Sequence, residues 1–167
     1  MGSRNEAVNS AKKQPTCPAG ETTAPCPCPV YKTQPTLDQI KADPCVDKEL
    51  KKAWDESNPN APDVPRGTDG STKKEQGGWI VWNKDTGQLE VYRVPAGTRD
   101  GLGPIVGTRP PDNEHQQVVS WFHTHPNKNS EGYGQEPSPG DTGWQNSEAK
   151  VPGIIETHDG RKTIPYP

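Results

Sequence analysis

The chain has 167 residues and a formal net charge of −3 at pH 7, and only 27% of its residues are hydrophobic, with 20 prolines and 17 glycines. This apolar content is too low for the whole chain to pack around one hydrophobic core. We therefore expect an extended part and one compact domain. Acidic and basic residues are mixed without a basic stripe, which argues against a nucleic-acid partner, and no apolar run approaches the roughly 18 residues that span a bilayer.

Residues 1–44 are predicted to form a leader or linker that is rich in proline and cysteine, ahead of a domain at residues 45–167. Prolines interrupt any regular helix or central strand up to residue 35, and residues 36–40 form one helical turn at most. All the cysteines of the chain lie in or next to this leader: Cys17, Cys26, Cys28 and Cys45. Their proline-rich surroundings favour disulfides, and free thiols are the alternative. A four-thiolate zinc site is disfavoured, because no C-x-x-C pair is present.

The domain is predicted to begin with a helix at residues 45–57, because Val46, Leu50 and Trp54 recur every four residues among charged neighbours. Two strands then follow, joined by a turn, and a third strand is nearly continuously apolar, which is typical of a strand covered on both faces. A short helix with Asp141 as its N-cap and a final hairpin complete the order of elements. The expected ranges are 78–82, 89–94 and 118–122 for the strands, 142–149 for the helix and 154–164 for the hairpin.

The candidate chemistry lies at the end of the third strand. His123 and His125 are two residues apart, so in a strand both imidazoles point to the same side. Asp141, which opens the next helix, is a convenient third ligand. Two imidazoles and one carboxylate suit Zn²⁺, and three protein ligands leave one tetrahedral position open, as in catalytic zinc sites.

A hydrolytic site of this kind also needs a carboxylate that carries a proton without binding the metal. Glu75 is the candidate, because it precedes a predicted strand whose glycines allow close approach of backbone and substrate. Ser138 is expected to donate its hydroxyl to the oxyanion of the tetrahedral intermediate. Glu90 and Glu114 are the less favoured alternatives to Glu75.

Each candidate also has an ordinary structural interpretation. His123 and His125 could be plain strand histidines, and Asp141 could serve only as a helix cap. Glu75 could belong to a solvated charged run, and Ser138 could be a turn residue. Their combination in one chain favours a functional site. Among the aromatic residues, most are expected in the core, and two with polar neighbours are expected at a binding rim: Tyr133 and Trp144.

Three short segments resemble the JAMM motif of the JAB/MPN metallopeptidases: Glu75-Gln76-Gly77-Gly78, His123-Thr124-His125-Pro126 and Ser138-Pro139-Gly140-Asp141. The resemblance covers residues 45–167 and implies an α+β fold with a mixed, curved β-sheet flanked by helices. It gives the roles named above to the same five residues: Glu75, His123, His125, Ser138 and Asp141. Members of the family cleave peptide or isopeptide bonds, including bonds to ubiquitin-like proteins. The resemblance therefore implies a zinc-dependent hydrolase with a protein or peptide substrate.

The chain departs from the family pattern between the second histidine and the serine, where the spacer of residues 126–137 is longer than usual. The insert, residues 127–136, is expected to bulge over the site as a substrate-gripping loop or a lid. Its two glutamates, Glu131 and Glu136, are further carboxylates that could approach the metal.

A leader rich in cysteine and proline before a small hydrolytic domain also resembles the junctions in bacterial polymorphic toxins, which carry JAB-like domains at their C-terminal tips. This second resemblance implies an effector toxin that is secreted by a specialised secretion system or delivered into a target cell, together with a cognate immunity protein. Without such delivery the expected location is the cytoplasm. The alternative function is a non-catalytic MPN-like protein-binding module. A zinc deaminase is disfavoured, because the two cysteine ligands of that class are absent from the motif.

Overall fold

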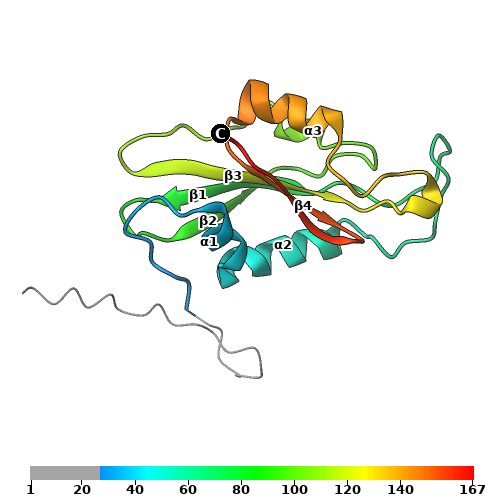
Figure 1. The fold of residues 1–167 in the computed structure, drawn as a ribbon. Coiled ribbons are helices and arrows are strands. Elements are labelled where there is room, and N and C mark those ends of the chain that lie inside the picture. The colour runs from blue at the N-terminus through cyan, green and yellow to red at the C-terminus, as the bar shows by residue number, and fades with distance from the viewer. Residues whose placement is uncertain (1–26) are drawn as a thin grey trace, which may run out of the picture.

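A five-stranded sheet between two helical layers forms the centre of the computed structural model, which describes residues 27–167 (Figure 1). The strands are β1 (Gly77–Asn83), β2 (Leu89–Arg93), β3 (Gln116–His125), β4 (Gly153–Thr157) and β5 (Gly160–Ile164). Their order is β2-β1-β3-β4-β5, and β3 pairs with β4 in parallel while the other neighbours are antiparallel. The predicted α+β class with a mixed sheet is therefore confirmed.

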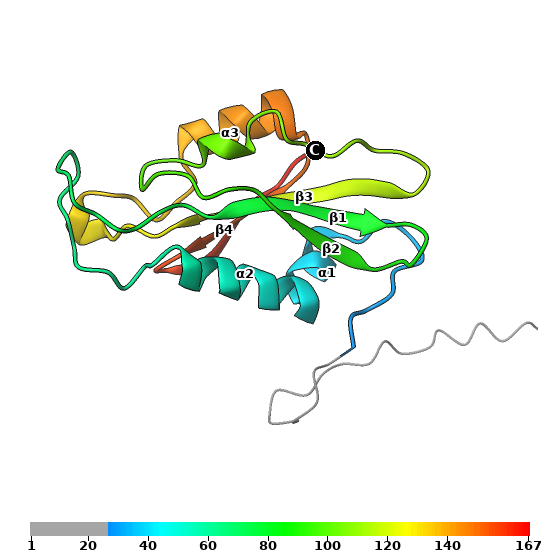
Figure 2. The ribbon, with the colours of Figure 1, turned by 180° about the vertical axis from the view of Figure 1, so that it is seen from behind.

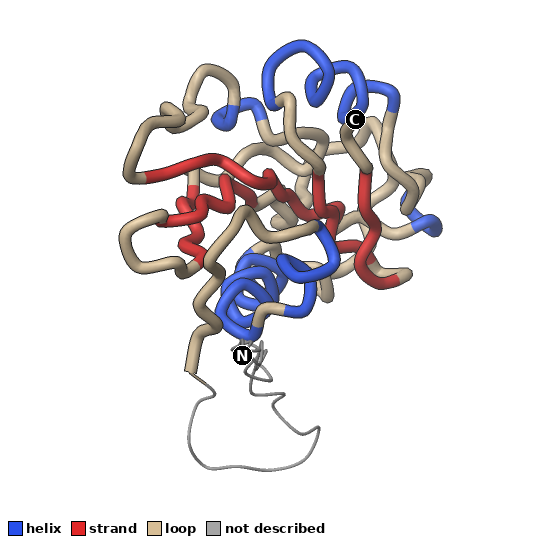
Figure 3. Tube along the Cα trace, turned by 60° about the vertical axis from the view of Figure 1, so that its left-hand side comes forward, coloured by secondary structure: helices blue, strands red, loops and turns tan. Residues whose placement is uncertain are grey.

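Helices cover both faces of this sheet, as the view from behind and the side view also show (Figures 2 and 3). On one face lie α1 (Leu37–Ala42) and α2 (Pro44–Glu56), and on the other lie α3 (Pro139–Trp144) and the π-helical turn η3 (Gln145–Ala149). Two short 3₁₀ turns, η1 (Gly103–Ile105) and η2 (Asn129–Glu131), interrupt the long loops. Within residues 27–167, no helix has the length and apolar character needed to cross a membrane.

The predicted helix at residues 45–57 corresponds to α2. Val46 and Leu50 are fully buried against the sheet, while Trp54 is half-buried. Asp43 caps the helix, because its carboxylate accepts hydrogen bonds from the amides of Cys45 and Val46 at 2.9 and 3.1 Å. The helix is thus held by an apolar stripe and a defined first turn.

Part of the segment assigned to the leader packs against the domain. Tyr31 and Ile40 lie in the same hydrophobic cluster as α2, and the Tyr31 hydroxyl donates to the Asp43 carboxylate at 3.1 Å. A capping box between Thr36 and Gln39 starts α1, which is longer than the single turn expected there. Cys28 and Cys45 form a disulfide, whereas Cys17 and Cys26 lie outside the described residues, as does the rest of the leader up to residue 26.

The two faces of the sheet carry separate hydrophobic clusters, because successive strand residues point to opposite sides. In β1, Ile80 faces α1 and α2, while Trp79 and Val81 belong to the cluster on the α3 side. In β3, a bulge leaves Val119 without a cross-strand partner: Ile80 pairs with Ser120, and Val81 pairs with Val118. Alternation resumes after the bulge.

The bulge fixes the face on which the histidines lie. Trp121 belongs to the cluster on the α3 side, and Phe122 belongs to the opposite cluster. His123 and His125 share the parity of Trp121, so they point toward α3. The strand itself continues to His125, three residues beyond the range expected from sequence, because β1 and β4 pair with it on both sides.

The helix expected at residues 142–149 begins earlier, and the prediction that Asp141 is its N-cap is wrong. Ser138 is the N-cap of α3, since its Oγ accepts a hydrogen bond from the Asp141 amide at 3.1 Å. Pro139 occupies the first turn, where its missing N–H costs nothing. Asp141 is therefore the third helical residue, and its side chain reaches back toward Ser138 and the sheet.

Candidate metal centre

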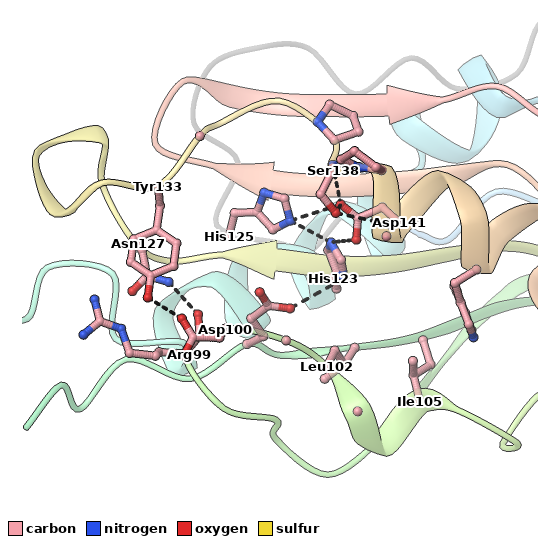
Figure 4. A pocket seen from close by; sticks show the side chains of 18 of the residues that line it. Arg99, Asp100, Leu102, Ile105, His123, His125, Asn127, Tyr133, Ser138 and Asp141 are labelled. Atoms are coloured by element: carbon pink, nitrogen blue, oxygen red, sulfur yellow. Dashed lines mark hydrogen bonds and ion pairs between the residues drawn. The ribbon is translucent and has the colours of Figure 1, made fainter. Parts of the chain in front are cut away.

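Three potential metal ligands converge where β3 meets α3 (Figure 4). The Nε2 atoms of His123 and His125 are 3.0 Å apart. One Asp141 carboxylate oxygen lies 3.3 Å from His123 Nε2, and the other lies 3.5 Å from His125 Nε2. One donor atom from each residue lies within 4.8 Å of the others. The metal group, as we call His123, His125 and Asp141, is therefore compact enough to bind a single metal ion.

Backbone pairing sets the position of the two histidines. His123 lies between Gly77 of β1 and Ile155 of β4, and His125 pairs with Thr157 of β4. The Trp121 ring packs edge-on against the His123 ring, with 5.2 Å between their centroids. His123 is thus held by both neighbouring strands and by the Trp121 ring. Its side chain is buried, while that of His125 is half-buried.

The electrostatics of the group suit a cation. Burial lowers the pKa of His123 to about 4, with Asp141 opposing and His125 reinforcing that shift, so the imidazole is neutral at pH 7. Burial opposes ionisation of Asp141, but hydrogen bonds and charge from His125, His123 and Ser138 together hold the pKa of its carboxyl well below the usual range. A neutral imidazole and an ionised carboxylate are the forms that bind metals.

Ser138 orients the Asp141 ligand. Its backbone N–H and its hydroxyl each donate to Asp141 Oδ2, and both distances are 2.7 Å. These hydrogen bonds and the helix cap fix the carboxylate relative to β3, in the way that outer-shell partners orient metal ligands. In this structure the Ser138 hydroxyl proton is therefore directed at Asp141, and its predicted role at an oxyanion remains a prediction.

Glu75 lies beside the metal group without joining it. Its Oε2 atom is 3.7 Å from His123 Nδ1, on the opposite side of the ring from Asp141, and has no hydrogen-bond partner among the described residues. Burial raises the pKa of Glu75 to about 9, and the charges of Asp141 and Asp100 add to the shift. A raised pKa makes the carboxylate form of Glu75 a stronger base. A cation bound nearby would favour that charged form, so the residue could then accept a proton.

The chain around Glu75 is fixed by pairing with its neighbours. The Glu75 amide donates to the Thr98 carbonyl at 2.9 Å, and the next residue, Gln76, exchanges hydrogen bonds with Thr124 between the two histidines. Gly77 permits this close approach, because a Cβ there would collide with the Leu102 side chain and the Phe122 carbonyl. The glycine at position 77 is therefore required by the close packing of backbone and side chains beside Glu75.

A cavity of about 600 Å³ opens in front of these residues. It is lined by all five predicted site residues and by three further segments: the loop of residues 99–106, the insert of residues 127–136, and α3. Tyr133 and Trp144, which we predicted at a binding rim, both line it, whereas Glu90 and Glu114 do not. The five candidates are therefore brought together at one concave surface.

The hypothesis that Glu131 approaches the metal is wrong, because this carboxylate forms a different cluster. It is fully buried and pairs with Lys73 and, at 3.3 Å, with Arg99. It also accepts hydrogen bonds from the amides of Val64 and Lys128 at 3.0 and 2.8 Å. Glu136 lines the cavity but lies 2.7 Å from Lys162, and the metal group does not include it.

Several cavity residues gave no signal in the sequence. Arg66 and Arg99 stand in loops with no motif around them, and Leu102 and Ile105 belong to a glycine-rich stretch that resembled an ordinary connection. His158, which we expected at the surface, is half-buried, and its Nε2 lies 2.9 Å from the Pro126 carbonyl. Contacts between loops that are far apart in the sequence leave no local sequence pattern from which they could be predicted.

Comparison with known proteins gave no match: no protein-family model, no curated protein and no solved structure resembles this chain significantly. What the structure defines is an α+β domain with a mixed sheet and a group of two histidines and one aspartate that could hold a metal ion.

Proposed function

We propose that this chain is a zinc-dependent hydrolase of peptide or isopeptide bonds, of the JAMM type found in JAB/MPN domains. The observation that carries the proposal is the meeting of the metal group with Glu75, a carboxylate 3.7 Å from His123 that is not one of the three ligands. A hydrolytic site requires a carboxylate of this kind to carry protons, and a carboxylate beside a ligand histidine can also orient that ligand.

The donor set favours zinc among the common metals. Two imidazole nitrogens and a carboxylate oxygen are typical ligands of Zn²⁺, and three protein ligands leave a position free for a reactant. A zinc ion held there supplies a Lewis acid that polarises the carbonyl group and makes water a better nucleophile at neutral pH.

The residues of the chain supply the remaining functions. Glu75 takes a proton from the attacking water and returns it to the leaving nitrogen, and its buried position keeps its basicity high. Ser138 holds Asp141 in place, and its hydroxyl, which lines the cavity, donates to the developing oxyanion in the proposed reaction.

Metal analysis and a search for cleavage products test this proposal together. Purified wild type, Glu75→Gln and the control Glu114→Gln, which changes an exposed carboxylate outside the cavity, are loaded with zinc and analysed for metal content. Each is then incubated with cell lysate and with cell-wall fragments, and new termini are identified by mass spectrometry. Glu75→Gln should keep its zinc and lose turnover by about 100-fold or more, while Glu114→Gln should match the wild type.

The outcomes separate the competing functions. A wild type that binds zinc but generates no new termini fits the alternative, a non-catalytic MPN-like binding module. A wild type that binds no zinc contradicts the proposed hydrolase. Action as a secreted effector toxin, with a cognate immunity protein, is a further proposal that rests on the leader sequence alone.

A further inference from the structure

The cavity extends to two sides of the metal group, and the two sides differ in chemistry (Figure 4). In this view Leu102 lies below His123 and Ile105 lies below and to its right, whereas Arg99 and Tyr133 lie to its left. A substrate whose scissile amide lies at His123 must therefore place one flanking residue on each side.

The first side is an apolar subsite. Leu102 and Ile105 are buried in the cluster on the α3 side of the sheet, and Val106 follows them at the rim with 56% of its surface exposed. Trp144 of α3 also lines this part of the molecule and packs edge-on against Trp121 at 5.0 Å. An exposed valine beside buried leucine, isoleucine and tryptophan offers apolar area that a bulky side chain would cover.

The second side is a cationic subsite. The Tyr133 ring lies 5.1 Å from the Arg66 guanidinium and 5.0 Å from that of Arg99, so one aromatic ring holds two cations close together. Arg66 is exposed, and it forms no ion pair with any residue in the range 27–167. Its charge is therefore available to a ligand.

The carboxylates near this subsite already have partners. Glu131 is paired with Lys73 and Arg99, and Glu136 is paired with Lys162. Asp100 accepts a hydrogen bond from the Tyr133 hydroxyl. A neutral hydroxyl does not cancel the charge of Asp100, but the cations of this region still outnumber its carboxylates: Arg66, Lys73, Arg99 and Lys128 against Asp63, Asp100 and Glu131. Arg66 is the cation among them that has no ion pair within residues 27–167.

The two subsites are close enough to be filled by neighbouring residues of one peptide. Arg99 and Leu102 are three residues apart in the same loop, so their Cα atoms are separated by no more than about 11 Å. The bridge between Thr98 and Gly101 shortens that distance further. Residues on either side of one amide bond have side chains that reach over such a span.

We infer that the substrate is a peptide in which the cleaved amide joins a bulky apolar residue to a residue that carries a carboxylate. This inference rests on the proposed function for the position of the scissile bond, but the two subsites stand on the contacts described above.

Peptide binding to zinc-loaded Glu75→Gln protein tests the inference without requiring turnover. The probes are fluorescein-labelled hexapeptides with Phe-Glu or Glu-Phe at the centre of a Gly/Ser frame, and fluorescence anisotropy gives their Kd. The controls replace the glutamate by lysine or the phenylalanine by glycine. The better of the two orders should bind at least about threefold more tightly than its lysine counterpart and about tenfold more tightly than its glycine counterpart.

Two exposed rim positions separate the subsites without touching the core. Arg66→Glu should abolish or reverse the preference for glutamate over lysine while keeping the preference for phenylalanine, and Val106→Asp should do the opposite. Lys32→Glu, the same change of charge at an exposed site outside the cavity, should alter neither ratio. Equal binding of the glutamate and lysine probes, or a ratio that Arg66→Glu leaves unchanged, overturns the inference.

Cleavage of the same peptides by the zinc-loaded wild type reports separately on the proposed function. Binding with the expected preferences but without cleavage supports the subsites and counts against hydrolysis. Cleavage that shows no preference among the probes supports hydrolysis and overturns the inference.

Discussion

Two regions that border the same cavity are stabilised in different ways. The end of β3, which presents His123 and His125, is held by backbone hydrogen bonds to β1 and β4 on both sides. The insert of residues 127–136 has no strand partner and is held by side chains, chiefly by the buried carboxylate of Glu131. One region owes its shape to the sheet, and the other owes it to a set of side-chain contacts in which Glu131 is the buried centre.

Because of this difference, substitutions at the metal ligands and substitutions in the insert should have different effects on the stability of the fold. Backbone pairing does not depend on the identity of a side chain, so the histidines can be replaced without loss of the strand. The insert depends on Glu131 and its partners, so a change there affects the fold and the cavity wall together. The following predictions test the contrast, from the largest expected effect to the smallest.

Replacing a histidine of β3 should abolish metal binding and leave the fold intact. For His125→Ala we expect zinc affinity to fall by more than the roughly 10–100-fold that accompanies loss of an outer-shell partner. The urea midpoint of the metal-free protein should stay close to that of the wild type, because the side chain is half-buried at the end of the strand. Zinc titration and urea unfolding monitored by circular dichroism measure the two effects.

The control for that experiment is His115→Ala, which removes an exposed histidine outside the metal group. It should leave zinc affinity unchanged. Retention of wild-type affinity by His125→Ala would remove this residue from the metal group.

Replacing the charge of Glu131 should destabilise the domain. In Glu131→Gln the fully buried ammonium of Lys73 loses its shortest contact and keeps the more exposed Asp63 carboxylate at 3.7 Å. Breaking a buried pair in this way costs about 3 kcal/mol. Urea unfolding of the metal-free protein gives the difference in free energy. Adding Lys73→Met, which removes the buried charge that has lost its main partner, should recover part of the loss.

Glu136→Gln is the matched control in the same insert. The Glu136 side chain is 74% exposed, so its ion pair with the half-buried Lys162 is screened by solvent and the free energy of unfolding should stay within experimental error. Equal effects of the two substitutions would show that Glu131 does not anchor the insert.

The Glu131 carboxylate should also make the free energy of unfolding depend on pH. Burial opposes its ionisation, but hydrogen bonds from Lys73 and from backbone amides hold the pKa of Glu131 below its usual range. The unfolded chain therefore binds a proton at Glu131 more readily than the folded chain does. Its contribution to stability is complete above the ordinary carboxyl pKa of about 4.3 and is lost as the pH falls through the lowered pKa of the folded state.

Urea unfolding of metal-free protein at a series of pH values from about 6 to 3 measures this dependence. The free energy of unfolding should decline toward low pH in the wild type and less steeply in Glu131→Gln. Asp47, Asp63 and Asp141, whose carboxyl pKa values are also lowered in the folded chain, leave a residual decline in the variant. Parallel curves for the two proteins would contradict the prediction.

The smallest effect is expected at Ser138, which links α3 to the metal group. Ser138→Ala removes the helix cap and one of the two hydrogen bonds to Asp141 Oδ2, so unfolding should become easier by about 1 kcal/mol. Zinc affinity should fall by about tenfold, because the remaining backbone bond still orients the ligand. Ser147→Ala, at an exposed hydroxyl in η3, should change neither quantity.

Local sequence patterns predicted the types of the helices and strands near the site correctly, but they predicted less well where those elements begin and end. The period of α2 and the apolar run of β3 gave the right element types, and the spacing of His123 and His125 correctly placed both rings on one face. The start of α3 was misjudged, because an aspartate before a helical stretch is a common cap and nothing in the sequence excluded Asp141 from that role. The Ser138 cap and Pro139 were equally consistent with an earlier start.

The sequence by itself determined the strand and helix types, the side-by-side histidines and the candidate residues Glu75, Ser138 and Asp141, because these follow from periodicity and from motif chemistry over a few residues. Only the tertiary structure decided that Tyr31 joins the core, that Glu131 turns away from the metal group toward Lys73, and that Arg66 and Leu102 border the same cavity. Such contacts join loops that are tens of residues apart. Their energies depend on burial and charge pairing in three dimensions, which no local pattern of residues encodes.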